Sequence, residues 1–158
     1  MALIKPRALL LFCGAASLAL LGYGLYLQHW QDLAPCPLCV IQRYAFCGIA
    51  LFCLTGGLGN ATRLGAAFGL LSALGGLGTA IRHVWIQAHP TVSCGIDPME
   101  TSLNRIISAQ LLPQVFKADG LCSDVHAPIL GLTIPQWALV WFGAFTLLLL
   151  WSLVQRRD

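Results

Sequence analysis

The chain has 158 residues, of which 58% are hydrophobic and only 9% are charged. An ordinary soluble domain carries roughly 25% charged residues, so this composition excludes a typical soluble protein. The formal net charge is +3, but the nine basic residues form no tract, and we therefore expect no nucleic-acid partner.

Four apolar segments are each about 20 residues long, the length that a helix needs to cross a hydrocarbon core of about 30 Å. No Asp or Glu interrupts any of them. Lipid offers no partner to backbone polar groups, so each segment is expected to be helical. The sequence thus predicts an all-α membrane protein, a four-helix transmembrane bundle in a single domain over residues 1–158, with helices at about 8–27, 40–58, 64–84 and 135–154.

The first segment has features of a secretory signal, because Lys5 and Arg7 precede its apolar run. Its removal would leave three crossings and would put Arg156 and Arg157 on the outer side of the membrane. Basic residues favour the cytoplasmic side, so this outcome conflicts with the charge pattern. We expect the segment to be retained as the first transmembrane helix.

The charged residues also predict the topology. Basic residues lie near the N-terminus, in the turn between the second and third segments, and at the C-terminus, as cytoplasmic segments require. Five acidic residues lie in the two other connections: Asp32, Asp97, Glu100, Asp119 and Asp124. We therefore expect both termini in the cytoplasm, and periplasmic loops at about 28–39 and 85–134, the second of them long.

Seven cysteines are present, and their placement points to redox chemistry. Three lie inside predicted helices, whereas four lie in or beside the outward loops: Cys36, Cys39, Cys94 and Cys122. A zinc site would need a second close pair or histidines at ligand spacing, which His29, His89 and His126 do not provide, so we expect no metal. Two structural disulfides remain an alternative, because they would constrain the long loop.

The stretch "PCPLCVIQR" holds the close pair Cys36 and Cys39. A C-x-x-C bridge closes a very short loop and constrains the unfolded chain little, so such pairs are typically reactive. Cys39 is at the start of the second helix, where the helix dipole favours a thiolate. Arg43 is one turn further along and can stabilise that thiolate or a polar oxygen of a lipid-soluble ligand. The alternative is that Arg43 reaches the headgroups near Asp32.

Residues 99–116, "METSLNRIISAQLLPQVF", mix apolar and polar side chains within the long loop. This pattern predicts a short helix that lies on the bilayer surface, where it would keep the distant cysteines close to the membrane. A loop helix that packs on the bundle is an equally good interpretation.

The order of these motifs resembles that of the bacterial disulfide bond formation protein B (DsbB) family. The resemblance rests on "PCPLC" with Arg43 after it, on the separated pair Cys94 and Cys122, and on "LPQVFKADGLC" and "LGLTIPQW", and it covers nearly the whole chain. It implies an inner-membrane oxidoreductase that reoxidises a periplasmic, DsbA-type thiol oxidase of thioredoxin-like fold. The electrons would pass to membrane quinone, either ubiquinone or menaquinone, and so to the respiratory chain.

The same resemblance implies roles for individual residues. Cys94 would be attacked by the partner's cysteine, and Cys122 would then exchange with Cys36. Cys39 would donate electrons to the quinone, while Arg43 holds a ring oxygen. The matching family histidine is His83, near the outer end of the third helix and close to the quinone.

Two other functions remain open at this point. A vitamin K epoxide reductase-like enzyme is also a helical membrane protein that uses thiols and quinone, although the cysteine order fits it less well. A non-enzymatic four-helix membrane protein with two structural disulfides is the alternative from a different class.

Overall fold

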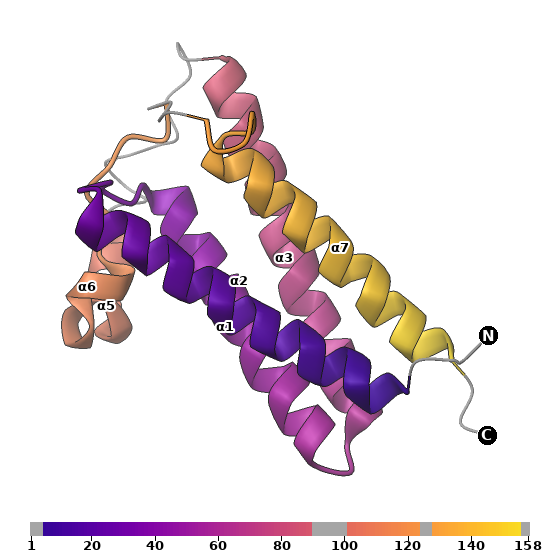
Figure 1. Cartoon of the computed structure of the whole chain (residues 1–158). Coiled ribbons are helices and arrows are strands. Elements are labelled where there is room, and N and C mark those ends of the chain that lie inside the picture. The colour runs from indigo at the N-terminus through magenta and orange to yellow at the C-terminus, as the bar shows by residue number, and fades with distance from the viewer. Residues whose placement is uncertain (1–4, 90–100, 124–127, 156–158) are drawn as a thin grey trace.

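The computed structural model describes residues 5–89, 101–123 and 128–155 (Figure 1). Within these residues all regular elements are helices, and four of them are long and apolar enough to cross a membrane: α1 (Pro6–Trp30), α2 (Pro37–Leu58), α3 (Thr62–Ala88) and α7 (Ile134–Val154). The four predicted helices and the all-α membrane class are therefore confirmed. Each helix matches its predicted segment or extends beyond it by up to four residues at an end.

Proline and side-chain caps explain where three of these helices begin. Pro6, Pro37 and Pro135 lie in the first turn of α1, α2 and α7, where the missing N–H has no helical partner to lose. At the start of α7, Thr133 and Gln136 form a capping box, in which the Thr133 N–H donates to Gln136 Oε1 at 2.9 Å.

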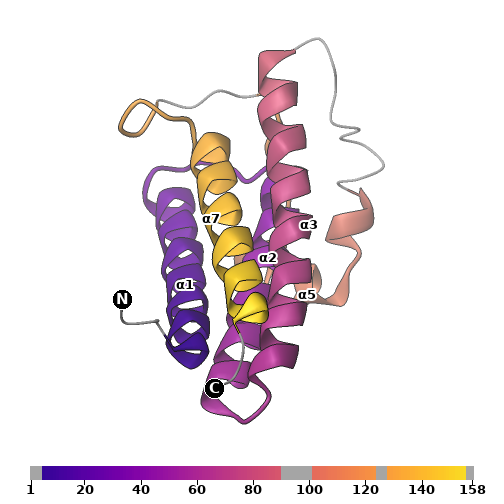
Figure 2. The same cartoon turned by 90° about the vertical axis from the view of Figure 1, so that its right-hand side faces the viewer.

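The long helices run back and forth, with α2 between α1 and α3, and α3 also packed against α7 (Figures 1 and 2). The beginning of α1, the α2–α3 turn and the end of α7 lie at one end of the bundle. The α1–α2 connection and the beginning of α7 lie at the other end, which we call the loop end. The core between the helices contains Leu10, Ile49, Phe142, Phe145 and Leu149, all fully buried.

Two short helices, α5 (Ile107–Leu111) and α6 (Pro113–Phe116), lie outside the bundle beside α2. The Phe116 ring stacks on Tyr44 with a centroid distance of 4.4 Å, and the Tyr44 hydroxyl lies 2.6 Å from Ser108 Oγ. The expected single helix is thus divided, because Pro113 donates no backbone hydrogen bond and starts a new helix. The segment packs on the bundle, yet Ile107 and Leu111 remain more than 70% exposed.

Candidate functional site

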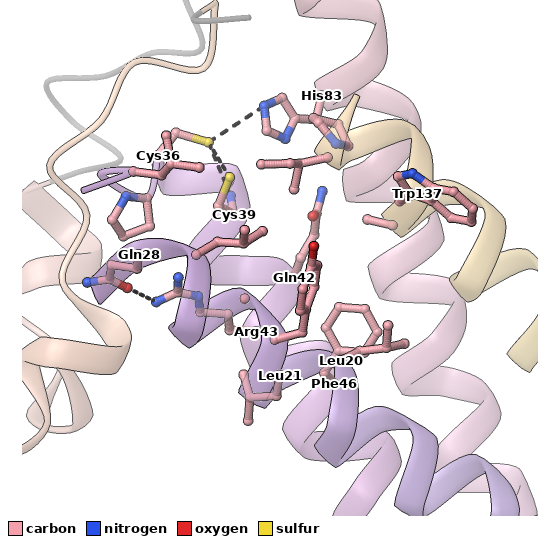
Figure 3. Close-up of a pocket in the computed structure, with 18 of the residues that line it drawn as sticks. Leu20, Leu21, Gln28, Cys36, Cys39, Gln42, Arg43, Phe46, His83 and Trp137 are labelled. Atoms are coloured by element: carbon pink, nitrogen blue, oxygen red, sulfur yellow. Dashed lines mark hydrogen bonds between the residues drawn. The ribbon is translucent and has the colours of Figure 1, made fainter. Parts of the chain in front are cut away.

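A cavity of about 360 Å³ opens between the transmembrane helices at the loop end (Figure 3). Its walls are mostly apolar and include Leu20, Leu27, Phe46, Trp137 and Trp141. The polar groups on its surface include both cysteines of the close pair and side chains from three helices: Gln28, Cys36, Cys39, Gln42, Arg43, His83 and Gln87. An apolar cavity with a few polar groups is the usual form of a small-molecule site.

The close cysteine pair lies at the upper edge of this cavity (Figure 3). Cys36 is the N-cap of α2, and its sulfur accepts a hydrogen bond from the Cys39 N–H at 3.3 Å. Both side chains are free thiols, and the Cys36 S–H donates to Cys39 Sγ at 2.9 Å. This hydrogen bond, together with burial, raises the pKa of Cys36 above its ordinary value. In the reduced pair, Cys36 therefore holds the proton and Cys39 accepts its hydrogen bond.

His83 lies on α3 and faces the Cys36–Cys39 pair, which is at the start of α2. Its Nε2 atom lies 3.7 Å from Cys36 Sγ, and only 3% of the residue is exposed. The ligand atoms of Cys36, Cys39 and His83 all lie within 4.8 Å of one another. They could hold a metal ion only with a further ligand from outside this group, because a zinc site takes four. Sequence spacing did not indicate His83 as a ligand, and only the family resemblance pointed to this residue.

Arg43 is almost completely buried, with 9% of the residue exposed. Its Nη1 donates to Gln28 Oε1 on α1 at 2.7 Å and to the Val115 carbonyl oxygen in α6 at 2.6 Å. These two bonds tie the α5–α6 segment to the wall of the cavity. Arg43 binds Gln28 and Val115 here, which is not the arrangement near Asp32 that the alternative interpretation describes. These two bonds use two of the five N–H groups of the Arg43 guanidinium, and three are not used by them.

Cys122 comes close to the first pair because the segment before it crosses the α1–α2 connection. The N–H groups of Asp119 and Gly120 donate to the Pro35 carbonyl at 3.0 and 3.1 Å. Cys122 and Cys36 then belong to one buried cluster with Leu38 and Ile86.

A missing side chain at Gly120 makes this crossing possible. A Cβ atom there would overlap the Ala34 carbonyl oxygen and would lie 3.2 Å from the Cys36 nitrogen.

Cys122 is itself disulfide-bonded. Cys94 lies outside the described residues.

The other cysteines lie away from the cavity. Cys13 and Cys53 belong to the buried core between the helices. Cys47 packs against the cluster of Val40 and Phe116, beneath the α5–α6 segment. None of the three lines the cavity, and each packs among apolar side chains as a small apolar residue.

Sequence reasoning missed three polar residues on the cavity surface, Gln28, Gln42 and Gln87. Gln28 was assigned to a loop, but α1 continues to Trp30 and turns the Gln28 side chain toward Arg43. Gln42 is 6% exposed, lines the cavity, and its Nε2 has no hydrogen-bond partner among the described residues. Its position at i+3 from Cys39 was a usable signal, since such residues share a helix face.

A family model and several known proteins that are similar to this chain all carry the same description. The family model described as "Disulfide bond formation protein DsbB" matches residues 6–152. The disulfide bond formation protein B of Herminiimonas arsenicoxydans is 54% identical, over 98% of this chain and 99% of the relative. The protein of the same name from Ralstonia nicotianae is 46% identical over 97% of each chain, and that from Cupriavidus pinatubonensis is 44% identical over 97% of this chain and 96% of the relative.

Proposed function

The chain belongs to the disulfide bond formation protein B family and is a multi-pass membrane oxidoreductase that generates disulfides, and from this premise we propose its electron path. It accepts two electrons from a periplasmic, DsbA-like thiol oxidase and delivers them to a membrane quinone. The loop end of the bundle faces the periplasm and both termini are cytoplasmic, an orientation that the basic residues near the termini and in the α2–α3 turn favour.

The observation that carries this proposal is the contact between the reactive pair and the cavity. Cys39 lies on the cavity surface, and its sulfur is 2.9 Å from that of Cys36. Apolar and aromatic walls suit a planar, lipid-soluble ring, and the unpartnered side-chain nitrogens of Gln42 and His83 suit its carbonyl oxygens. The residues present therefore fit a quinone, which supplies two-electron acceptor chemistry when bound.

The relay runs by thiolate attack on disulfides. The partner's thiolate attacks Cys94 of a Cys94–Cys122 disulfide, which forms a mixed disulfide and releases Cys122 as a thiolate. The partner's second thiolate then attacks the partner sulfur of the mixed disulfide, which forms the partner's disulfide and releases Cys94 as a thiolate. The thiolate of Cys122 attacks Cys36 of the Cys36–Cys39 disulfide and releases Cys39 as a thiolate. The Cys122 and Cys36 side chains share one buried cluster, which supports direct exchange between the two pairs.

The second half of the relay regenerates the oxidised pairs. Cys94 attacks Cys122 to restore their disulfide and releases Cys36, so that Cys36 and Cys39 are both reduced. Re-formation of the Cys36–Cys39 disulfide gives up two electrons and two protons, which convert the quinone to quinol. The net reaction is oxidation of one partner dithiol by one quinone, and no other oxidant is needed.

Arg43 and His83 act on either side of Cys39. The Arg43 side chain lines the cavity and carries N–H groups beyond those bound to Gln28 and Val115, so its charge favours the Cys39 thiolate and a ring oxygen. His83 lies within reach of the Cys36 sulfur and can accept or return a proton there.

Quinone-dependent oxidation of a reduced thioredoxin-like protein tests this function. The purified protein is assayed in lipid nanodiscs under anaerobic conditions, with Cys36, Cys39, Cys94 or Cys122 changed to serine. We expect each substitution to abolish turnover, whereas Cys47→Ser, which removes a thiol away from the cavity, retains it. Full activity in the Cys39→Ser protein would overturn the proposal, and resistance of all bridges to the partner would favour structural disulfides.

A further inference from the structure

Three buried side-chain nitrogen or oxygen atoms have no hydrogen-bond partner in the described part of the chain: Ser17 Oγ, Gln42 Nε2 and His83 Nδ1. A buried polar atom without a partner is costly and uncommon, so each one calls for an explanation. Two of the three residues, Gln42 and His83, line the same cavity. This coincidence points to a ligand that supplies the missing acceptor.

Gln42 is the better placed of the two to meet a ligand below Cys39. It lies one helical turn deeper on α2 than Cys39, and Figure 3 shows it in the cavity between Cys39 and Phe46. Arg43 lines the cavity on a different side, where its guanidinium donates to Gln28 Oε1. Gln42 is therefore the polar group of α2 that faces the interior of the cavity on the side of Trp137 and His83.

Building on the proposed function, we propose that the side-chain amide of Gln42 donates a hydrogen bond to one carbonyl oxygen of the bound quinone. An amide N–H donates and a quinone oxygen accepts, so the contact satisfies the buried Nε2 atom. Since Gln42 and Cys39 share a helix face, the bond fixes the ring next to the sulfur that delivers the electrons. Gln42 thus contacts the electron acceptor directly and contributes to its affinity.

Substitution separates a Gln42 that binds quinone from a Gln42 that is merely structural. A glutamine that only fills space can be replaced by leucine or methionine of similar size with no effect on quinone binding. A glutamine that donates to the quinone cannot, because the carbonyl oxygen loses a partner in a site of low polarity. If a water molecule, and not the quinone, accepted the hydrogen bond from Gln42 Nε2, replacing Gln42 with leucine or methionine would leave the quinone affinity unchanged.

The test is the carbonyl stretch of quinone labelled with ¹³C at its carbonyl carbons, measured by redox-difference infrared spectroscopy of the protein in nanodiscs. We expect one carbonyl band to shift to higher frequency in Gln42→Leu and in Gln42→Met. The KM for quinone should rise roughly threefold to tenfold, the loss expected for one neutral hydrogen bond. Thiol exchange between the partner and the quinone-free protein should not change.

Ser17→Ala is the matched control, because it removes the third unpartnered atom, which lies outside the cavity. This variant should keep both the band position and the KM of the unmodified chain. Identical bands and KM values in the Gln42 variants and the unmodified chain would overturn the inference while leaving the proposed function intact. Failure of the unmodified chain to reduce quinone would instead refute the proposed function itself.

Discussion

Replacing Gly120 with alanine should slow electron transfer between the two cysteine pairs while leaving each pair chemically competent. Gly120 crosses the α1–α2 connection at the point where its N–H donates to the Pro35 carbonyl. A Cβ atom there would overlap the Ala34 carbonyl oxygen and lie 3.0 Å from the carbonyl carbon. Both are backbone atoms, so no side-chain rotation relieves the collision.

The size of the effect follows from the required displacement. A carbon atom and a carbonyl oxygen normally approach no closer than about 3.3 Å, so the crossing segments must separate by about 1 Å. Cys122 is two residues from Gly120 and shares a buried cluster with Cys36, so the displacement acts on the sulfur that we propose attacks Cys36. A misplacement of about 1 Å can reduce the rate of a positioned reaction by about 100-fold.

Rapid mixing separates the two halves of the reaction. Reduced partner is mixed with the quinone-loaded protein, and mixed-disulfide formation and quinol appearance are followed separately. In Gly120→Ala we expect normal mixed-disulfide formation and quinol appearance slowed by about 100-fold. Gly22→Ala, where an added Cβ meets nothing within 4 Å, is the control. Quinol appearance at the normal rate in Gly120→Ala would refute the reasoning.

Three further predictions concern the cavity and its supports. Arg43→Met should release α6, seen as faster hydrogen exchange of the amides that close this short helix, and should weaken quinone use; unchanged exchange would contradict the contact. Gly76→Ala should lower the free energy of unfolding by about 1–3 kcal/mol, because its Cβ overlaps a buried phenylalanine ring, whereas Gly75→Ala should not; equal thermal midpoints would count against this packing. Cys39→Ala should speed alkylation of Cys36 at pH 8, because losing the hydrogen bond to Cys39 lowers the raised pKa of Cys36; equal rates would exclude that cause.

The transmembrane helices were predictable because each needs about 20 apolar residues, and local sequence carries that signal. The ends were less predictable. Pro37 starts α2 earlier than hydropathy indicates, and α1 continues through Gln28, because polar residues at helix ends interrupt the apolar pattern without interrupting the helix.

The candidate site was predictable only in part. Cys36, Cys39 and Arg43 are close in sequence, and the helical period indicates their shared location. The bond from Arg43 to Val115 joins residues 72 positions apart, so no local pattern reveals it. Gln42 was within reach of helical spacing, but its significance depends on a cavity that three other helices, α1, α3 and α7, help to form.

The measurement that tests the electron path most directly is a single turnover without the partner. The Cys94→Ser, Cys122→Ser double variant is reduced, freed of reductant and mixed anaerobically with one equivalent of a short-chain quinone. We predict one quinol for each Cys36–Cys39 disulfide formed, counted by thiol labelling, and none in the same protein with Cys39→Ser added. Quinol formation without Cys39, or loss of thiols without quinol, would contradict the account.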